Sequence, residues 1–128
     1  MQPSAPLRAR PCLAALRGGN LLNGVANAPP GLVLALTIML EIFATTSMKL
    51  AVRNKVWYAG VFLGYALCFT LFPIALCSMP LSIAYATWSG VGTAASVLIG
   101  VLLFGEVLKP LKLLWVLLII AGVVGLNL

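Results

Sequence analysis

The chain has 128 residues, of which 62% are hydrophobic and 8% charged, and its mean hydropathy is +1.14. Soluble globular domains of this size carry more charge, so the composition predicts an integral membrane protein and excludes an ordinary soluble domain. The formal net charge of +6 indicates no nucleic-acid partner here, because the basic residues flank apolar runs, where they act as topology signals.

Few side chains are available for chemistry. The chain has three cysteines, no histidine and only two acidic residues, Glu41 and Glu106. No nucleophile, base and orienting group occur together, so we predict no enzymatic activity, no metal site and no cofactor. Any proton chemistry must draw chiefly on the two glutamates.

Residues 1–30 differ in composition from the rest of the chain. They contain Arg8, Arg10 and Arg17, no acidic residue, and Pro29-Pro30 at their end. We predict an N-terminal extension that is disordered or a leader. An organelle transit peptide and translation from an upstream start codon are alternatives, and a transit peptide would place the protein in an organelle membrane instead of the cell membrane.

Residues 31–128 form the predicted transmembrane domain, an all-α bundle of four helices. It contains four apolar runs, each long enough to cross a bilayer, at about residues 31–51, 56–77, 81–104 and 111–128. The connections are short, so consecutive helices must be antiparallel. The side of the bundle with the connections between helices 1 and 2 and between helices 3 and 4 carries the basic residues Arg53, Lys55, Lys109 and Lys112. The positive-inside rule places these connections in the cytoplasm, although the arginines of residues 1–30 weaken that bias.

The first apolar run contains Glu41. At about 1.5 Å per residue the run spans roughly 30 Å, which puts Glu41 near the bilayer midplane. A carboxylate is costly there and predicts a functional site; a neutral glutamate that only joins helices by a hydrogen bond is the alternative. Thr37 and Thr45 each lie four residues from Glu41, on the same face of the helix. Their hydroxyl groups either handle a ligand or bond to their own helix.

Aromatic residues on the next two helices can complete a site for an apolar cation. Tyr65 and Phe69 are four residues apart, and Tyr85 and Trp88 lie within one turn. Aromatic ring faces attract cations, most strongly where water is excluded, although such spacing is also typical of simple packing. Gly90 and Gly92 follow directly, and we expect them to permit close helix approach or a bend.

These residues resemble the motifs of small multidrug resistance transporters over residues 31–128. The stretch Glu41-Ile-Phe-Ala-Thr-Thr-Ser-Met-Lys49 is similar to the family pattern E-x-x-x-T-x-x-x-K. The stretch Pro80-Leu-Ser-Ile-Ala-Tyr-Ala-Thr-Trp-Ser-Gly-Val-Gly92 is similar to P-x-x-x-A-Y-A-x-W-x-G-x-G. Phe104-Gly-Glu106 also stands at the expected place before the last helix.

The resemblance implies an antiparallel homodimer that exchanges protons for hydrophobic cations in the cell membrane, with both competing for Glu41. It implies that Tyr65, Tyr85 and Trp88 shape the pocket, that Thr45 lines it, and that the last helix dimerises. Two glycines seven apart often mark that helix in the family. Here Gly122 fits the second position and Trp115 occupies the first, which leaves the dimer seam open. Ala44 stands where guanidinium exporters tend to have tryptophan, so the chain resembles the quaternary-ammonium branch.

Antiport also follows from physical chemistry. A low dielectric and a second nearby Glu41 favour the protonated carboxyl group, whereas a bound cation favours the ionised form, so each expels the other. Four helices are too few to enclose a pathway, which predicts at least a dimer, with itself or with a paralogous subunit. Two alternatives stay open: export of guanidinium or another small metabolite cation, and a membrane subunit that assembles with larger complexes without transporting anything.

Overall fold

The computed structural model describes Val25 and residues 28–128. It contains the four predicted helices: α3 (Pro30–Ala51), α4 (Trp57–Leu76), α5 (Leu81–Phe104) and α6 (Pro110–Asn127). All four are long and apolar enough to cross a membrane, which confirms the predicted all-α membrane fold. The predicted extension, residues 1–30, lies outside the described residues except for Val25 and residues 28–30.

Proline and glycine set several helix ends. Pro30 and Pro110 occupy the first turn of α3 and α6, where the missing backbone donor is not needed. Gly105 ends α5 with a left-handed backbone (φ 62°), a conformation that glycine adopts without strain. Pro73 lies inside α4, and the helix continues past it to Leu76.

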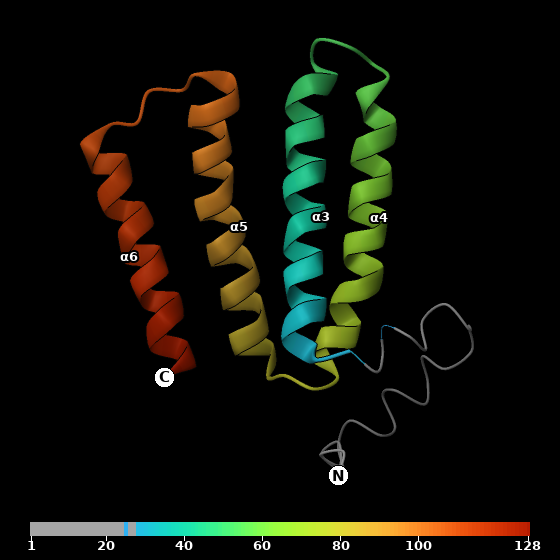
Figure 1. The fold of residues 1–128 in the computed structure, drawn as a ribbon, viewed down its shortest axis with the longest axis vertical. Helices are drawn as coiled ribbons and strands as arrows, with labels where there is room; N and C mark the ends of the chain where they lie inside the picture. The colour runs from blue at the N-terminus through green and yellow to red at the C-terminus, as the bar shows by residue number, and fades with distance from the viewer. Residues whose placement is uncertain (1–24, 26–27) are drawn as a thin grey trace.

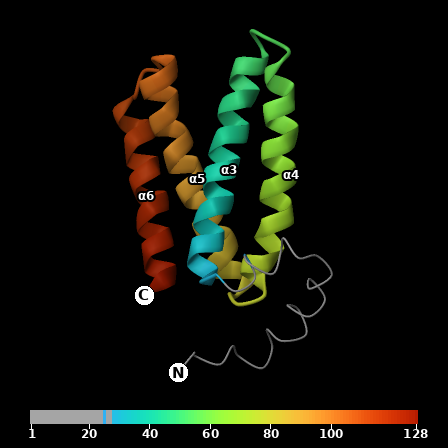
Figure 2. The same ribbon diagram turned by 45° about the vertical axis from the view of Figure 1, so that its right-hand side comes forward.

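The helices form two antiparallel hairpins that meet through α3 and α5 (Figure 1). The α3–α4 and α5–α6 connections lie at one end of the bundle, which we call the loop side, and the α4–α5 connection and the C-terminus lie at the other (Figures 1 and 2). Apart from Glu41, every charged side chain among residues 28–128 belongs to the loop side or to the last turn of α3 before it.

Small residues allow α3 and α4 to approach each other closely. A Cβ atom added to Gly64 would lie 2.9 Å from the Cβ atom of Ala44, and Ala44 itself is fully buried. Helices in lipid associate through such close packing, because lipid chains are as apolar as the side chains and provide little hydrophobic drive. At the end opposite the loop side, Val33, Leu34 and Ile38 of α3 pack with Ile74 and Ala75 of α4 to form the hydrophobic core.

Helix α6 packs chiefly against α5. No residue of α6 is buried, and its main neighbour is α5 (Figure 1). The closest approach is at Gly90, where an added Cβ atom would clash with Val123 and meet Ile119 at 3.3 Å. Near the C-terminus, the side-chain amide of Asn127 also donates a hydrogen bond to Thr87 Oγ1 at 3.2 Å.

We predict that Gly90→Ala separates α5 from α6. The new methyl group overlaps Val123, so the helices must move apart at a cost of about 1–3 kcal/mol. Denaturant titration of the protein in micelles, followed by circular dichroism, measures the loss. Gly31→Ala is the control within the chain, because a Cβ atom there meets nothing within 4 Å and the residue lies outside α6. Equal stability of the two variants would contradict this account of the α5–α6 contact.

Candidate functional site

Glu41 lies in the middle of α3, and its carboxylate points at α5. A Cβ atom added to Gly92 would lie 2.7 Å from Oε2 of Glu41 and 3.2 Å from its Cδ. Gly92 is buried, so the carboxylate rests on a patch of α5 backbone that no side chain could share. The sequence suggested Gly92 as a point of close approach or bending; α5 is a single helix through it, and the bend stays a prediction.

The Glu41 carboxylate has no hydrogen-bond partner on Oε2. This oxygen is buried, and no donor reaches it within the described part of the chain. A buried acceptor without a partner is expensive, because it loses water and gains nothing in return. A proton or a cationic group placed at this oxygen would offset that cost.

The threonines beside Glu41 bond to their own helix. Thr37 Oγ1 donates to the Leu34 carbonyl at 2.7 Å, and Thr45 Oγ1 donates to the carbonyl of Glu41 itself at 2.9 Å. Their hydroxyl protons are therefore used by the backbone. Thr45 still lies one turn from Glu41 on the same face, so its oxygen atom remains available as an acceptor for a ligand.

An aromatic cluster lies between α4 and α5, with Trp88 at its centre. The Trp88 ring lies 6.3 Å from Phe69, 5.1 Å from Phe72 and 5.7 Å from Tyr85, measured between ring centroids. Tyr65 stacks on Phe69 at 6.0 Å. The structure thus brings together all four aromatic residues singled out from the sequence. Phe72 was missed, although its spacing of three from Phe69 is a helical-face signal.

The cluster is open on one side in the single chain. Phe69 is 58% exposed and Tyr85 is 54% exposed. Trp88 Nε1 is buried and has no acceptor in bonding geometry among the described residues. The Cys68 thiol lies near Trp88 and Glu41, but donates instead to the Thr37 carbonyl at 3.3 Å. The described chain therefore builds one wall of the site, and the Phe69 and Tyr85 rings are exposed on its open side.

Gly122, the predicted dimerisation residue, points away from its own chain. Neither Gly122 nor Gly125 has a neighbour within 4 Å of an added Cβ atom. Both glycines thus leave α6 with a smooth surface that no described residue covers. The role of Gly122 in a dimer stays a prediction.

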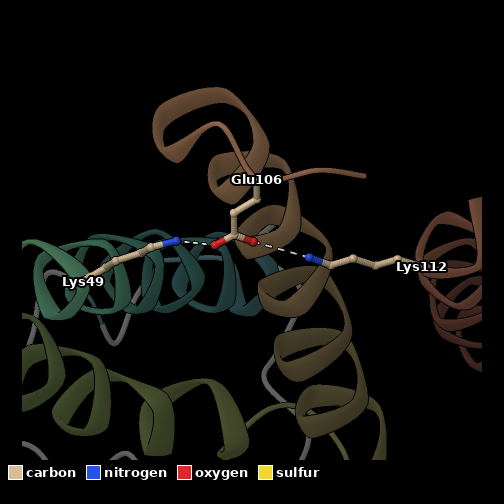
Figure 3. Close-up of polar contacts among 3 residues, drawn as sticks. All are labelled: Lys49, Glu106 and Lys112. Atoms are coloured by element: carbon tan, nitrogen blue, oxygen red, sulfur yellow. Dashed lines mark hydrogen bonds and ion pairs between the residues drawn. The ribbon is translucent and has the colours of Figure 1, made fainter. Parts of the chain in front are cut away.

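A second polar cluster stands at the loop side, and the sequence did not indicate it. Glu106 forms ion pairs with Lys49 from α3 and with Lys112 from α6 (Figure 3). The hydrogen bond from Lys49, assisted by that from Lys112, holds the pKa of Glu106 below its usual range. Both Lys49 and Glu106 remain accessible to water in this pair.

Four apolar helices, a buried carboxylate without a partner and an adjacent aromatic wall define a multi-pass membrane protein built around an intramembrane acid. The sequence profile of the Small Multidrug Resistance protein family matches residues 31–124. The chain belongs to this family. It is therefore a transporter of the cell membrane and not an enzyme, as the sequence predicted.

The chain is similar to several proteins named for multidrug resistance. The chain is 46% identical to multidrug resistance protein EbrB of Bacillus subtilis, over 75% of this chain and 84% of the relative. It is 41% identical to multidrug resistance protein EbrA of Bacillus atrophaeus, over 73% and 91%. It is 38% identical to multidrug resistance protein Mmr of Mycobacterium tuberculosis, over 76% and 94%.

We predict that Gly92→Ala displaces the Glu41 carboxylate. The added methyl group would lie 2.7 Å from Oε2 of Glu41, so the carboxylate, at the end of a flexible side chain, must leave its rotamer at a cost of about 0.5–1.5 kcal/mol. Denaturant titration in micelles measures the destabilisation. Gly31→Ala, at the start of α3 and open to its surroundings, is the matched control. If the two variants were equally stable, the carboxylate would not be seated on Gly92.

Proposed function

We propose that the protein exports lipophilic or quaternary-ammonium cations in exchange for protons, and that proton and cation compete for Glu41. The observation that carries the proposal is the buried, unpartnered Oε2 of Glu41 beside the aromatic wall. A proton neutralises this carboxylate and a cation compensates its charge, so either one relieves the cost of burial.

Competition at one carboxylate is sufficient for coupling. When a cation binds, the ionised form of Glu41 is favoured and its proton leaves; when a proton binds, the attraction for the cation is lost. Neither state lets both occupy the site. If access alternates between the two faces of the membrane, each cation leaving is exchanged for protons entering.

The aromatic wall supports an apolar cation as the substrate. The rings of Tyr65, Phe69, Tyr85 and Trp88 offer large apolar surfaces whose faces attract positive charge. A small, strongly hydrated cation would gain little from them. The relatives named above are called multidrug resistance proteins, which favours the same substrate class over guanidinium.

A second subunit completes the proposed site. The exposed rings of Phe69 and Tyr85 and the uncovered α6 need a partner surface or lipid. An antiparallel homodimer would bring two copies of Glu41 to the midplane. A paralogous partner is the alternative, and it is favoured by the occurrence of both an EbrA and an EbrB in Bacillus subtilis.

We predict that cation binding depends on pH through Glu41. Binding should weaken as pH falls, by about tenfold per pH unit below the midpoint for each proton that must be displaced. In Glu41→Asp the midpoint should move to lower pH by about half a unit, because aspartate is intrinsically more acidic than glutamate. Isothermal titration of the purified protein with tetraphenylphosphonium measures both quantities.

Glu41→Gln removes the charge while keeping the shape of the side chain. Its affinity for tetraphenylphosphonium should fall about a hundredfold or more, with no remaining pH dependence, because a buried cation would lose its counter-charge. Binding that survives in this variant with its pH dependence intact would refute antiport and favour the assembly-subunit hypothesis.

We predict that the protein prefers tetraphenylphosphonium over guanidinium. Trp88→Ala should remove most of that preference, since the central ring of the aromatic wall is lost, with about a tenfold effect or more on tetraphenylphosphonium. Parallel titrations with both cations at one pH measure it. Trp115→Ala, which removes an exposed tryptophan of α6, is the control. Tighter binding of guanidinium would support the metabolite-exporter alternative.

A further inference from the structure

The ion pairs at the loop side are held in place by the local backbone. We call Lys49, Glu106 and Lys112 the loop-side clamp. The left-handed turn at Gly105 brings the chain back over α5, and the backbone amide of Glu106 donates to the Gly100 carbonyl at 3.0 Å. A Cβ atom on Gly100 would lie 2.8 Å from Oε2 of Glu106. The Glu106 carboxylate therefore occupies a position that these two glycines leave open.

The loop-side clamp joins three helices. Lys49 is in the last turn of α3, Lys112 is in the first turn of α6, and Glu106 follows the end of α5 (Figure 3). The ammonium group of Lys49 also lies 4.3 Å from the centroid of the Phe104 ring, which adds a cation–π contact. These contacts hold the end of the α3–α4 hairpin to the α5–α6 hairpin.

A half-open cavity lies beside the clamp, lined by residues of α3 and α5. Its volume is about 150 Å³, large enough for several water molecules. Lys49, Phe104 and Glu106 line its outer end, and Thr45 lies at its inner end. Because Thr45 is one helical turn from Glu41, the cavity leads from the loop-side surface toward the buried carboxylate.

The two ends of α3 are held against neighbouring segments by different interactions. The end opposite the loop side is packed by the hydrophobic core of Val33, Leu34 and Ile38 against α4. The loop-side end is closed by an ion pair whose side chains are 45% and 40% exposed to solvent. Water-exposed ion pairs contribute little free energy and rearrange readily, so this end is the easier one to open.

We propose that Lys49 and Glu106 control access to the cavity: their ion pair closes its loop-side mouth, and separation of the pair admits water and cations toward Glu41. Lys49 and Glu106 act as positioning residues and do not bind the transported cation. The arrival of a cation at Glu41 rests on the function proposed above for that residue. Closure of the cavity by the ion pair does not rest on it.

The Glu106 carboxylate stays ionised over the pH range in which cation binding is measured. The charged groups that face Glu106 are Lys49 from α3 and Lys112 from α6. Both keep the pKa of Glu106 below its usual range, so the carboxylate is ionised at neutral pH and the pair is lost only as pH falls through that lowered value. Between about pH 5 and pH 8, a pH dependence therefore cannot come from this carboxylate.

The test measures entry into the cavity directly. In the full chain with its native cysteines replaced by alanine, Thr46→Cys places a thiol in the cavity wall. A cationic methanethiosulfonate reagent, which does not cross lipid, then labels the protein in nanodiscs. Val56→Cys, exposed on the loop side, reports labelling outside the cavity. Lys109→Gln is the matched control variant, because it changes the charge of the same loop and Lys109 makes no ion pair in the described structure.

Glu106→Gln and Lys49→Gln should each raise the labelling rate of the cavity thiol about two- to fivefold over Lys109→Gln, the range expected for loss of an exposed ion pair. Labelling of the loop thiol introduced by Val56→Cys should not change. In Glu106→Gln the loss of a negative charge by itself slows labelling by a cationic reagent. A faster labelling rate in this variant therefore reports opening of the cavity. The double variant should be no faster than the faster single variant, because both remove the same pair.

Unchanged labelling in both single variants, or additive effects in the double variant, would overturn the proposal. Repeating the series with Glu41→Gln separates it from the proposed function. If Glu106→Gln still speeds labelling while Glu41→Gln leaves cation binding intact, the clamp is established and antiport at Glu41 is refuted. If Glu41→Gln abolishes cation binding while the clamp variants label like Lys109→Gln, control by the clamp is refuted and antiport stands.

Discussion

The contact between the Glu41 carboxylate and Gly92 is the constraint on which the rest of the structure depends. An acid without a partner is tolerated inside a membrane protein only where something else compensates it. Here the helices place it against bare backbone, which excludes competing side chains and donors. Its buried oxygen has no hydrogen-bond partner among the described residues, and this is the basis of the competition between proton and cation proposed above.

The same contact explains why α3 is the central helix. It packs against α4 through Ala44 and Gly64, and against α5 through Glu41 and Gly92. Small residues at both interfaces keep the three helices close together. One end of α3 is fixed by apolar packing and the other by exposed ion pairs. Because the ion-paired end of α3 is more easily released than the apolar end, the proposed opening of the bundle would begin at the loop side.

Much of the fold could be predicted because the membrane restricts the choices. The length of the apolar runs required helices, the short connections required hairpins, and Glu41 stood out because the residues around it in the first run are uncharged. Helical spacing could place Tyr65 beside Phe69 and Tyr85 beside Trp88 on their own helices. These properties depend on local sequence, so they do not require knowledge of the packing.

The residues that were missed depend on contacts between distant segments. The pairing of Glu106 with Lys49 joins positions 57 residues apart, and no spacing rule connects them. Phe72 gains its role only because α5 places Trp88 against it. Gly92 could be recognised as a small residue, but not as the seat of Glu41, since that requires the rotation of α5 relative to α3.

The isolation of α6 has a consequence for how its sequence can be understood. Apart from Lys112, Ile119, Val123 and Asn127, its side chains meet little of their own chain. Folding of the single chain therefore constrains most positions of this helix only to be apolar. Any stricter requirement for a particular side chain there, such as intolerance of a larger residue at Gly122 or Gly125, would be imposed by another molecule. A map of tolerated substitutions along α6 would then outline that molecule's surface.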